Sequence, residues 1–303
     1  TGSLVVTLEA LKEMHLTPED IQLIQNDTKT CPDTGMAGAS RSLYMDGNAT
    51  IIAANKLLAA MRKEDGTLRT YDEMKAEGIE TKYLGRYETN TTPGLCRLDP
   101  NTGIGDPTPA FTYCLNLAEV EVDTKTGKTT VLKFTCVDFV GRIGNIDAVN
   151  GQAYSGIMHG IGFALKEDYA DVKKHANMFG AGTSYIKDVP DDIDLIHIDG
   201  AISDGPFGSS GASEAFQASG HCAVLNGIYN ACGVRIHEIP ALPEKVKAGL
   251  DAIAKGEKPY EPKKYFLGSD MYEELENIKE NPVQVGTQSF YVSLDDPTAE
   301  RPF

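Results

Sequence analysis

Apolar residues recur at helical intervals in several stretches of the chain. The longest of these patterns predict helices at 40–61, 148–168 and 215–232, and shorter patterns predict helices at 3–14, 71–76 and 243–254. The sequence Thr17-Pro-Glu-Asp20 supplies an N-cap, a proline at the first helical position and early acidic residues. We therefore expect a short helical turn there.

A second pattern, the alternation of apolar and polar residues, predicts strands. Segments 111–122 and 129–139 alternate in this way, and Asp123-Thr-Lys-Thr-Gly127 between them is typical of a hairpin turn. Shorter strands are predicted at 21–25, 193–198 and 234–237. Together the two patterns favour a mixed α/β fold in which short sheets carry long helices.

The character of the chain changes at Gly256. Five prolines interrupt a charged segment, 256–303, with one helix expected at 270–277. We therefore divide the chain into a domain, 1–255, and an extended C-terminal arm, 256–303. Aromatic residues in the arm favour packing on a partner over a disordered terminus, the alternative that composition leaves open. At the other end, the chain begins inside an apolar pattern without Met, so we expect a piece of a longer polypeptide.

The composition argues against several classes of protein. The net charge of −16 is unlike that of a nucleic-acid-binding protein, and no apolar run approaches the ~20 residues of a membrane span. The six cysteines form no CxxC pair and the six histidines no HxxxH or HExxH motif, which argues against iron–sulfur clusters and protein-ligated metal in this chain. Scattered cysteines make a reducing cytoplasm the simplest compartment.

Loops rich in small residues precede each of the three long predicted helices. They are Cys31-Pro-Asp-Thr-Gly-Met-Ala-Gly-Ala-Ser-Arg41, Gly141-Arg-Ile-Gly-Asn145 and Asp204-Gly-Pro-Phe-Gly-Ser-Ser-Gly-Ala-Ser-Glu214. Glycine allows close approach of a ligand, and the amides at a helix start attract anions. One such loop is more often a plain surface turn, but three indicate an extended phosphate-bearing or dinucleotide ligand.

Two features restrict how such a ligand could be bound. Neither the GxGxxG spacing of a Rossmann site nor the GxxxxGK[ST] spacing of a P-loop is present. Arg41 and Arg142 are the only basic residues in the three loops, so backbone amides would do most of the binding. Glu214, at the end of the last loop, is a candidate base.

The segments Gly208-Ser-Ser-Gly-Ala-Ser-Glu214 and Asn230-Ala-Cys-Gly-Val-Arg-Ile-His-Glu-Ile-Pro-Ala-Leu-Pro-Glu-Lys245 resemble the C-terminal part of the molybdenum hydroxylases. That family comprises xanthine dehydrogenases and aldehyde oxidoreductases. The resemblance continues upstream through 141–164 and 32–41, and is nearest to bacterial aldehyde oxidoreductases that use molybdopterin cytosine dinucleotide. It implies the fold of the family's second molybdenum-cofactor-binding domain, an elongated mixed α/β domain with short mixed sheets and long helices.

The resemblance also implies a chemistry and a set of site residues. Glu214 would be the general base for hydroxylation of a substrate carbon with water-derived oxygen, and we expect its carboxyl group to be buried. Molybdenum would be held by the pterin dithiolene and not by protein ligands. The residues implied to contact the cofactor are Ala37, Gly38, Ala39, Ser40, Arg41, Asn145, Gln152, Gly211, Ala212 and Ser213. The substrate is expected to be an aldehyde; a purine or other N-heterocycle, or a non-catalytic subunit that keeps the fold, are the alternatives.

The chain departs from the family pattern in two ways. Ser213 stands where the family usually has glycine, and His159 where it often has glutamine. The family's [2Fe-2S] domains, first molybdenum domain and most of the substrate funnel would lie outside this segment. The partners implied are therefore the remainder of the molybdenum subunit and an iron–sulfur domain or subunit, in an assembly that forms a dimer. The substrate, the electron acceptor, the sulfido or oxo ligand and the stoichiometry stay open, as does the choice between a fragment of a longer polypeptide and a separate subunit of a divided enzyme.

Overall fold

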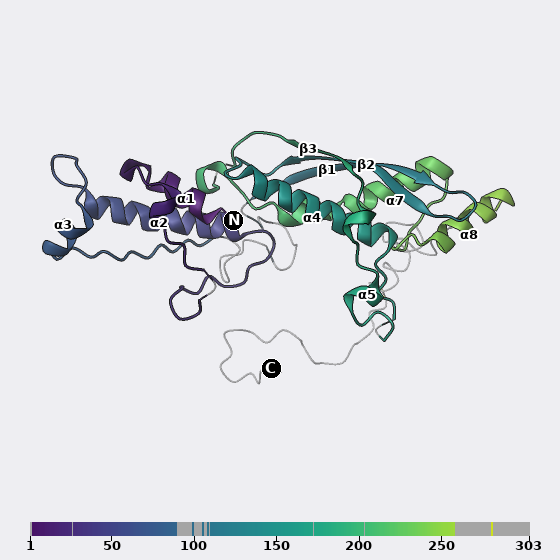
Figure 1. The fold of residues 1–303 in the computed structure, drawn as a ribbon, viewed down its shortest axis with the longest axis horizontal. Helices are drawn as coiled ribbons and strands as arrows, with labels where there is room; N and C mark the ends of the chain where they lie inside the picture. Colours follow the sequence, from purple (N-terminus) through teal and green to yellow (C-terminus); the bar gives the residue numbers. More distant parts are fainter. Residues whose placement is uncertain are drawn as a thin grey trace. The chain divides into compact units, whose positions relative to one another are not determined.

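The computed structural model describes residues 2–25, 27–89, 99, 105, 108, 110–171, 173–202, 204–257 and 280 (Figure 1). Contacts divide the chain into two compact units, Thr1–Pro259 and Tyr260–Phe303. Apart from Glu280, the second unit lies outside the described residues, as does the helix expected at 270–277. The division into a domain and an arm that packs on a partner therefore stays a prediction.

The helices follow the apolar pattern closely. Their bounds are α1 Ser3–Ala10, α2 Ser42–Met61, α3 Tyr71–Ala76, α4 Ile146–Leu165, α5 Met178–Ala181, α6 Ser213–Ala218, α7 Gly220–Cys232 and α8 Pro243–Ala254. Short 3₁₀ turns occur at η1 Lys12–Met14, η2 Pro18–Asp20, η3 Ile186–Asp188 and η4 Pro206–Gly208. The predicted helix at 215–232 is two helices, because the backbone leaves the helical conformation at Ser219 (φ −123°, ψ 0°). The predicted helix at 3–14 ends at Ala10 and continues only as the turn η1.

Three strands form one mixed sheet in the order β1-β2-β3. Strands β1 (Tyr113–Val122) and β2 (Thr129–Phe139) make the predicted antiparallel hairpin, and β3 (Asp192–His197) pairs with β2 in parallel. The strands predicted at 21–25 and 234–237 are wrong: neither segment pairs with a strand. Residues 21–25 are mostly exposed, and Val234 is buried among helical residues instead, beside Ile228 and Val246.

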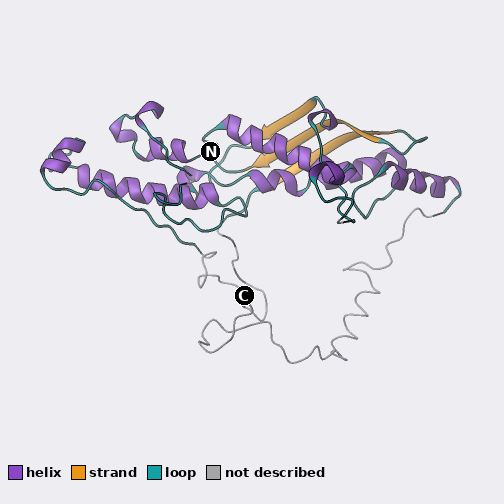
Figure 2. Cartoon of the chain, turned by 60° about the horizontal axis from the view of Figure 1, so that its bottom comes forward, coloured by secondary structure: helices purple, strands orange, loops and turns teal. Residues whose placement is uncertain are grey.

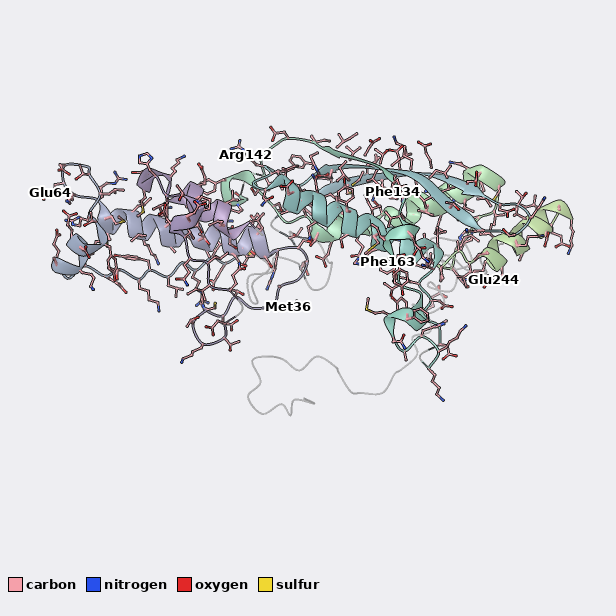
Figure 3. The ribbon with its side chains drawn as sticks, viewed as in Figure 1. Met36, Glu64, Phe134, Arg142, Phe163 and Glu244 are labelled. Atoms are coloured by element: carbon pink, nitrogen blue, oxygen red, sulfur yellow. The ribbon has the colours of Figure 1, made fainter. Side chains whose placement is uncertain are left out.

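Helices α4, α6 and α7 cover one face of the sheet (Figures 1 and 2). Phe134 of β2 lies fully buried in the core between them (Figure 3). Helix α4 packs very closely against α7 at this point. A Cβ on Gly160 of α4 would lie only 2.9 Å from the Cα of Gly220 in α7. The core cluster consists of Val131, Phe134, Cys136, Val140, Ala153, Ile157, Ile161, Ala164, Phe216 and Val224.

The opposite face of the sheet is apolar at one end, whereas Lys133 forms ion pairs with Asp192 and Asp194 at the other end. Tyr113, Leu115 and Leu117 alternate along β1 with exposed fractions of 64%, 62% and 57%. Leu115 pairs with Val137 of β2, which pairs in turn with Ile196 of β3, so the apolar residues form a row across all three strands. We call this surface the outer sheet face.

The first part of the chain packs separately around α2. Helix α1 lies on α2, and Leu11, Ala54 and Leu58 form a small core there. Helix α2 also contacts η4, where a Cβ on Gly47 would lie 2.6 Å from Cγ of Pro206. In the part of the chain that the structure describes, no helix combines the length and apolarity needed to cross a membrane.

Candidate functional site

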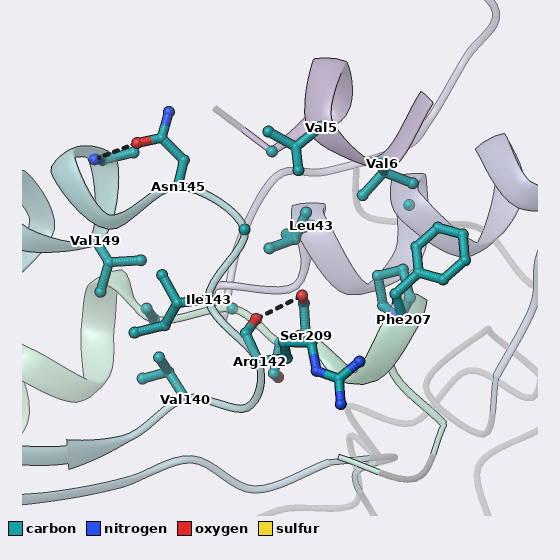
Figure 4. A pocket seen from close by; sticks show the side chains of 18 of the residues that line it. Val5, Val6, Leu43, Val140, Arg142, Ile143, Asn145, Val149, Phe207 and Ser209 are labelled. Atoms are coloured by element: carbon teal, nitrogen blue, oxygen red, sulfur yellow. Dashed lines mark hydrogen bonds between the residues drawn. The ribbon is translucent and has the colours of Figure 1, made fainter. Parts of the chain in front are cut away.

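The three small-residue loops predicted from the sequence meet around one cavity of about 850 Å³. Ser40 comes from the first loop, and Ser209 and Gly211 come from the third. Arg142 and Asn145 come from the second loop; Figure 4 labels both of them together with Ser209. Each loop leads into a helix, so the N-termini of α2, α4 and α6 lie on one cavity, and the first amides of α2 and α4 have no partner within their own helices.

Main-chain hydrogen bonds join the second and third loops. The Ser210 amide donates to the carbonyl of Val140 at 3.1 Å, and the Arg142 amide donates to the carbonyl of Gly208 at 2.8 Å. The Ser209 hydroxyl donates to the Arg142 carbonyl at 2.6 Å. Because these bonds use only backbone and one short side chain, this part of the cavity wall is fixed by the fold.

The first and third loops touch at Ser40 and Gly211. Ala39 and Ser40 both have left-handed backbone, with φ of 53° and 56°, which is unusual for residues other than glycine. This conformation brings the Ser40 carbonyl so close that a Cβ on Gly211 would lie 1.5 Å from its oxygen. Only glycine can occupy position 211 with the backbone in this arrangement.

The Ser40 side chain caps the start of α6. Its hydroxyl accepts a hydrogen bond from the Glu214 amide at 2.9 Å and donates to Glu214 Oε2 at 2.8 Å. The Ser213 hydroxyl lies 3.0 Å from the hydroxyl oxygen of Ser40. Since Ser40 has only one hydroxyl hydrogen, and that hydrogen points to the carboxylate, Ser213 is the donor of this third bond.

A second cavity, of about 410 Å³, adjoins the first at Ser40, Ser210 and Gly211. Glu214 lines this second cavity and is exposed, so the expectation that its carboxyl group is buried is wrong for this structure. Tyr44 also lines it, and burial raises the pKa of the Tyr44 phenol above its ordinary value. Tyr44 therefore stays protonated at neutral pH.

The first loop closes on itself. Arg41 donates from Nε and Nη2 to the Met36 carbonyl at 3.0 and 2.8 Å, so its guanidinium holds the loop together. Gly38, Ala39 and Arg41 line the second cavity. Ala37 is not among the residues that line either cavity.

The remaining predicted residues lie along α4. The Asn145 side chain accepts from the Ala148 amide at 3.0 Å and so caps the helix, as Figure 4 shows. Gln152 follows seven residues later, two helical turns on, and both side chains line the first cavity. Ala212 and Ser213 line it as well. The structure therefore brings six of the ten predicted cofactor residues to this cavity: Ser40, Asn145, Gln152, Gly211, Ala212 and Ser213.

Sequence reasoning missed one wall of the cavity. Helix α1 contributes Val5, Val6 and Glu9, and α2 contributes Asp46. Burial raises the pKa of Asp46, and the nearby Arg41 opposes this shift. The local pattern of α1 predicts only a helix, and nothing in it signals a contact with loops more than a hundred residues away.

Comparison with known proteins identifies the family. The model of the molybdopterin cofactor-binding domain matches residues 3–190. The chain belongs to this family. Its relatives also confirm the resemblance to the molybdenum hydroxylases, the family of aldehyde oxidoreductases and xanthine dehydrogenases.

Two aldehyde oxidoreductases show the closeness of the match. The chain is 43% identical to that of Megalodesulfovibrio gigas over 244 residues, which is 80% of this chain and 27% of the relative. It superimposes on the crystal structure of that from Desulfovibrio desulfuricans with a TM-score of 0.75 and 44% identity, covering 81% of this chain and 27% of that one. A probable hypoxanthine oxidase of Escherichia coli is 28% identical, over 82% of this chain and 28% of its own length. The chain thus spans about a quarter of these relatives.

The cavity suits the phosphate-bearing group that the family binds. Helix N-termini and loop amides supply donors for an anion, and Ser210 adds a hydroxyl group, whereas the hydroxyl hydrogens of Ser40 and Ser209 are already donated within the protein. The volume of about 850 Å³ lies within the usual range for cofactor sites. Glu9 and Asp46 also line the cavity and would repel an anion, although burial favours the neutral form of Asp46. The residues present therefore fit a polar, extended and anionic ligand held mainly by backbone.

Proposed function

We propose that this chain is the cofactor-binding and base-bearing part of a molybdenum hydroxylase that converts an aldehyde to a carboxylic acid. The observation that carries the proposal is the convergence of three helix N-termini on one cavity, with the Glu214 carboxylate beside it. The identity of 43% to an aldehyde oxidoreductase supports the choice of substrate class. The cofactor we propose is molybdopterin cytosine dinucleotide, because the first cavity has room for an extended ligand.

Different residues of the first cavity would bind different parts of the cofactor. The first amides of α2 and α4 would hold the pyrophosphate, since the free N–H groups there point out of the helix. The side-chain amides of Asn145 and Gln152 would bind polar groups along the same helix face. The absence of Cβ at Gly211 lets the backbone approach the ligand closely.

Glu214 would act as the base. When bound, the molybdenum–pterin group supplies the redox chemistry of hydroxylation, and the protein positions it and moves the proton. Ser40 donates to Oε2 of Glu214, so Oε1 is the oxygen that would accept the proton. Exposure of the side chain to the second cavity leaves that oxygen accessible.

The rest of the reaction would require other parts of the enzyme. We propose that the remainder of the molybdenum subunit completes the substrate site, that [2Fe-2S] clusters elsewhere in the assembly accept electrons, and that the assembly is a cytoplasmic dimer. The share of 27% of the aldehyde oxidoreductase relatives covered by this chain is consistent with this arrangement.

The test is carried out on the native enzyme that contains this chain. We expect molybdenum together with cytidine monophosphate after acid release. We also expect Glu214→Gln to lose turnover while both contents stay unchanged, and Glu19→Gln, an exposed carboxylate in η2, to behave as wild type. Unchanged turnover in Glu214→Gln would rule out the base role, and an enzyme without molybdenum would rule out the cofactor.

A second substrate class follows from one comparison. The probable hypoxanthine oxidase of Escherichia coli is similar to this chain over nearly the same share of its length, at 28% identity. We therefore propose an N-heterocycle hydroxylase as the alternative. Turnover of hypoxanthine with no turnover of aldehydes by the same preparation would favour it.

A further inference from the structure

We propose that Ser40 is a positioning residue, which holds the Glu214 carboxylate so that Oε2 is engaged and Oε1 faces the reacting proton. This inference rests on the proposed function, because it gives Ser40 a part in base catalysis. The hydroxyl of Ser40 serves the carboxylate in this role, so only its backbone remains for contact with the cofactor, and the bond links two loops that are 174 residues apart in the sequence.

The exposure of Glu214 makes such a residue necessary. A long side chain at the surface of a first helical turn is free to change rotamer, and holding it in one state costs conformational entropy. The described residues do not bury it. In the described part of the chain, the hydrogen bond from Ser40 is the one side-chain bond that fixes its carboxylate.

Ser40 is itself held in place, so its hydroxyl has a defined direction. The left-handed backbone at Ala39 and Ser40 is closed by a bond from the Arg41 amide to the Gly38 carbonyl at 3.2 Å. The Arg41 guanidinium then fixes the loop through the Met36 carbonyl. A rigid loop therefore orients a mobile carboxylate.

The Ser213 hydroxyl completes the arrangement. Its bond of 3.0 Å to the Ser40 oxygen, together with the bond from the Glu214 amide, saturates the two acceptor positions of Ser40. The Ser40 hydrogen is then directed to Glu214 Oε2. The serine at position 213 thus reinforces the orientation of the base.

The test compares variants of the full enzyme. We expect Ser40→Ala to lower kcat about tenfold to a hundredfold, as displacement of a catalytic group does, with KM and molybdenum content unchanged. In the Glu214→Gln background the same change should cause no further loss, because there is no base left to orient. Ser155→Ala, which removes an exposed hydroxyl from α4, is the matched control and should behave as wild type.

A second measurement does not depend on turnover. In enzyme produced without molybdenum cofactor, Ser40→Ala should speed hydrogen exchange at the Glu214 amide, which loses its acceptor. Unchanged exchange, unchanged kcat, or a molybdenum content that falls in proportion to kcat would each overturn the positioning role. Retained turnover in Glu214→Gln would instead overturn the proposed base, whatever Ser40→Ala does.

Discussion

Nδ1 of His197 lies 2.6 Å from Oδ2 of Asp138, and its Nε2 lies 2.8 Å from Oδ1 of Asn150. The three residues come from β3, β2 and α4, so one imidazole ties the sheet to the helix that lines the cavity. With Asn150 Oδ1 as acceptor, Nε2 carries a hydrogen and Nδ1 shares a proton with the buried Asp138. This partly buried network supports the end of the sheet from which the second loop leaves.

The network makes a prediction about pH. Burial raises the pKa of Asp138 above its ordinary 3.8, and His197 only partly offsets this shift. The folded protein therefore holds this proton more tightly than the unfolded chain, and the resulting contribution to stability is full below about pH 4 and is lost as pH rises through the raised pKa. In Asp138→Asn this dependence should disappear. Hydrogen exchange of β2 and β3 peptides at pH 5 and pH 8 would measure it, and equal pH dependence in both proteins would contradict the prediction.

The contact of Gly211 with Ser40 makes a prediction about cofactor content. In Gly211→Ala the new Cβ would collide with the Ser40 carbonyl, so the two loops must separate and the cavity should lose its shape. We expect little or no molybdenum in the purified variant. Gly151→Ala is the matched control, because no atom lies within 4 Å of its Cβ position on α4, and alanine there should stabilise the helix by about 0.5–1 kcal/mol. Normal molybdenum content in Gly211→Ala would contradict the close approach.

Two substitutions of Asn145 should distinguish its role as a helix cap from its proposed role in ligand binding. Asn145→Ala removes the bond to the Ala148 amide and should cost about 1 kcal/mol at the start of α4. Asn145→Asp keeps a good cap but places a negative charge where we propose an anion binds. We expect faster exchange of the Ala148 amide only in the alanine variant, and reduced cytidine nucleotide content in both. Full nucleotide content in Asn145→Asp would exclude a phosphate near this residue.

The core between the sheet and α4 should be sensitive to loss of volume. Phe134 is fully buried, so Phe134→Ala should cost about 3–5 kcal/mol through lost burial and a cavity. Phe179 in α5 is exposed, and Phe179→Ala should change stability by less than about 0.5 kcal/mol. Hydrogen exchange of peptides from β2 and α4 would report both changes. Equal protection in the two variants would show that the core does not depend on Phe134.

Much of the fold could be predicted because local signals set the element ends. The capping box of Thr70 with Glu73 fixes the start of α3, and Pro243 at the first position fixes the start of α8. Residues 21–25 have the composition of a strand, but among the described residues no strand pairs with them, and only tertiary structure decides that. The break at Ser219 likewise follows from packing, since Gly220 beside it lies against Gly160 of α4.

The three loops of the candidate site could be predicted from the sequence, but the contacts between them could not. Glycine and serine before a helix are visible in the sequence, so the three loops could be named before the structure placed them on one cavity. The contact between Ser40 and Glu214 could not be named, because no local pattern links residues 174 positions apart. The exposure of Glu214 could not be predicted from the sequence either. It depends on the side of the Ser40–Gly211 contact on which the Glu214 side chain lies, and only the folded structure determines this.

The outer sheet face has a consequence for the segment when it is separated from a larger assembly. Tyr113, Leu115 and Leu117 would meet water in a continuous row, and surfaces of this kind drive association between molecules. Within the described part of the chain, strand β1 also lies at the edge of the sheet, where backbone groups can add another strand. If a preparation of residues 2–257 self-associates, the association would therefore be explained by the apolar residues of this one face. The oligomeric state of that preparation would say nothing about the symmetry of the enzyme.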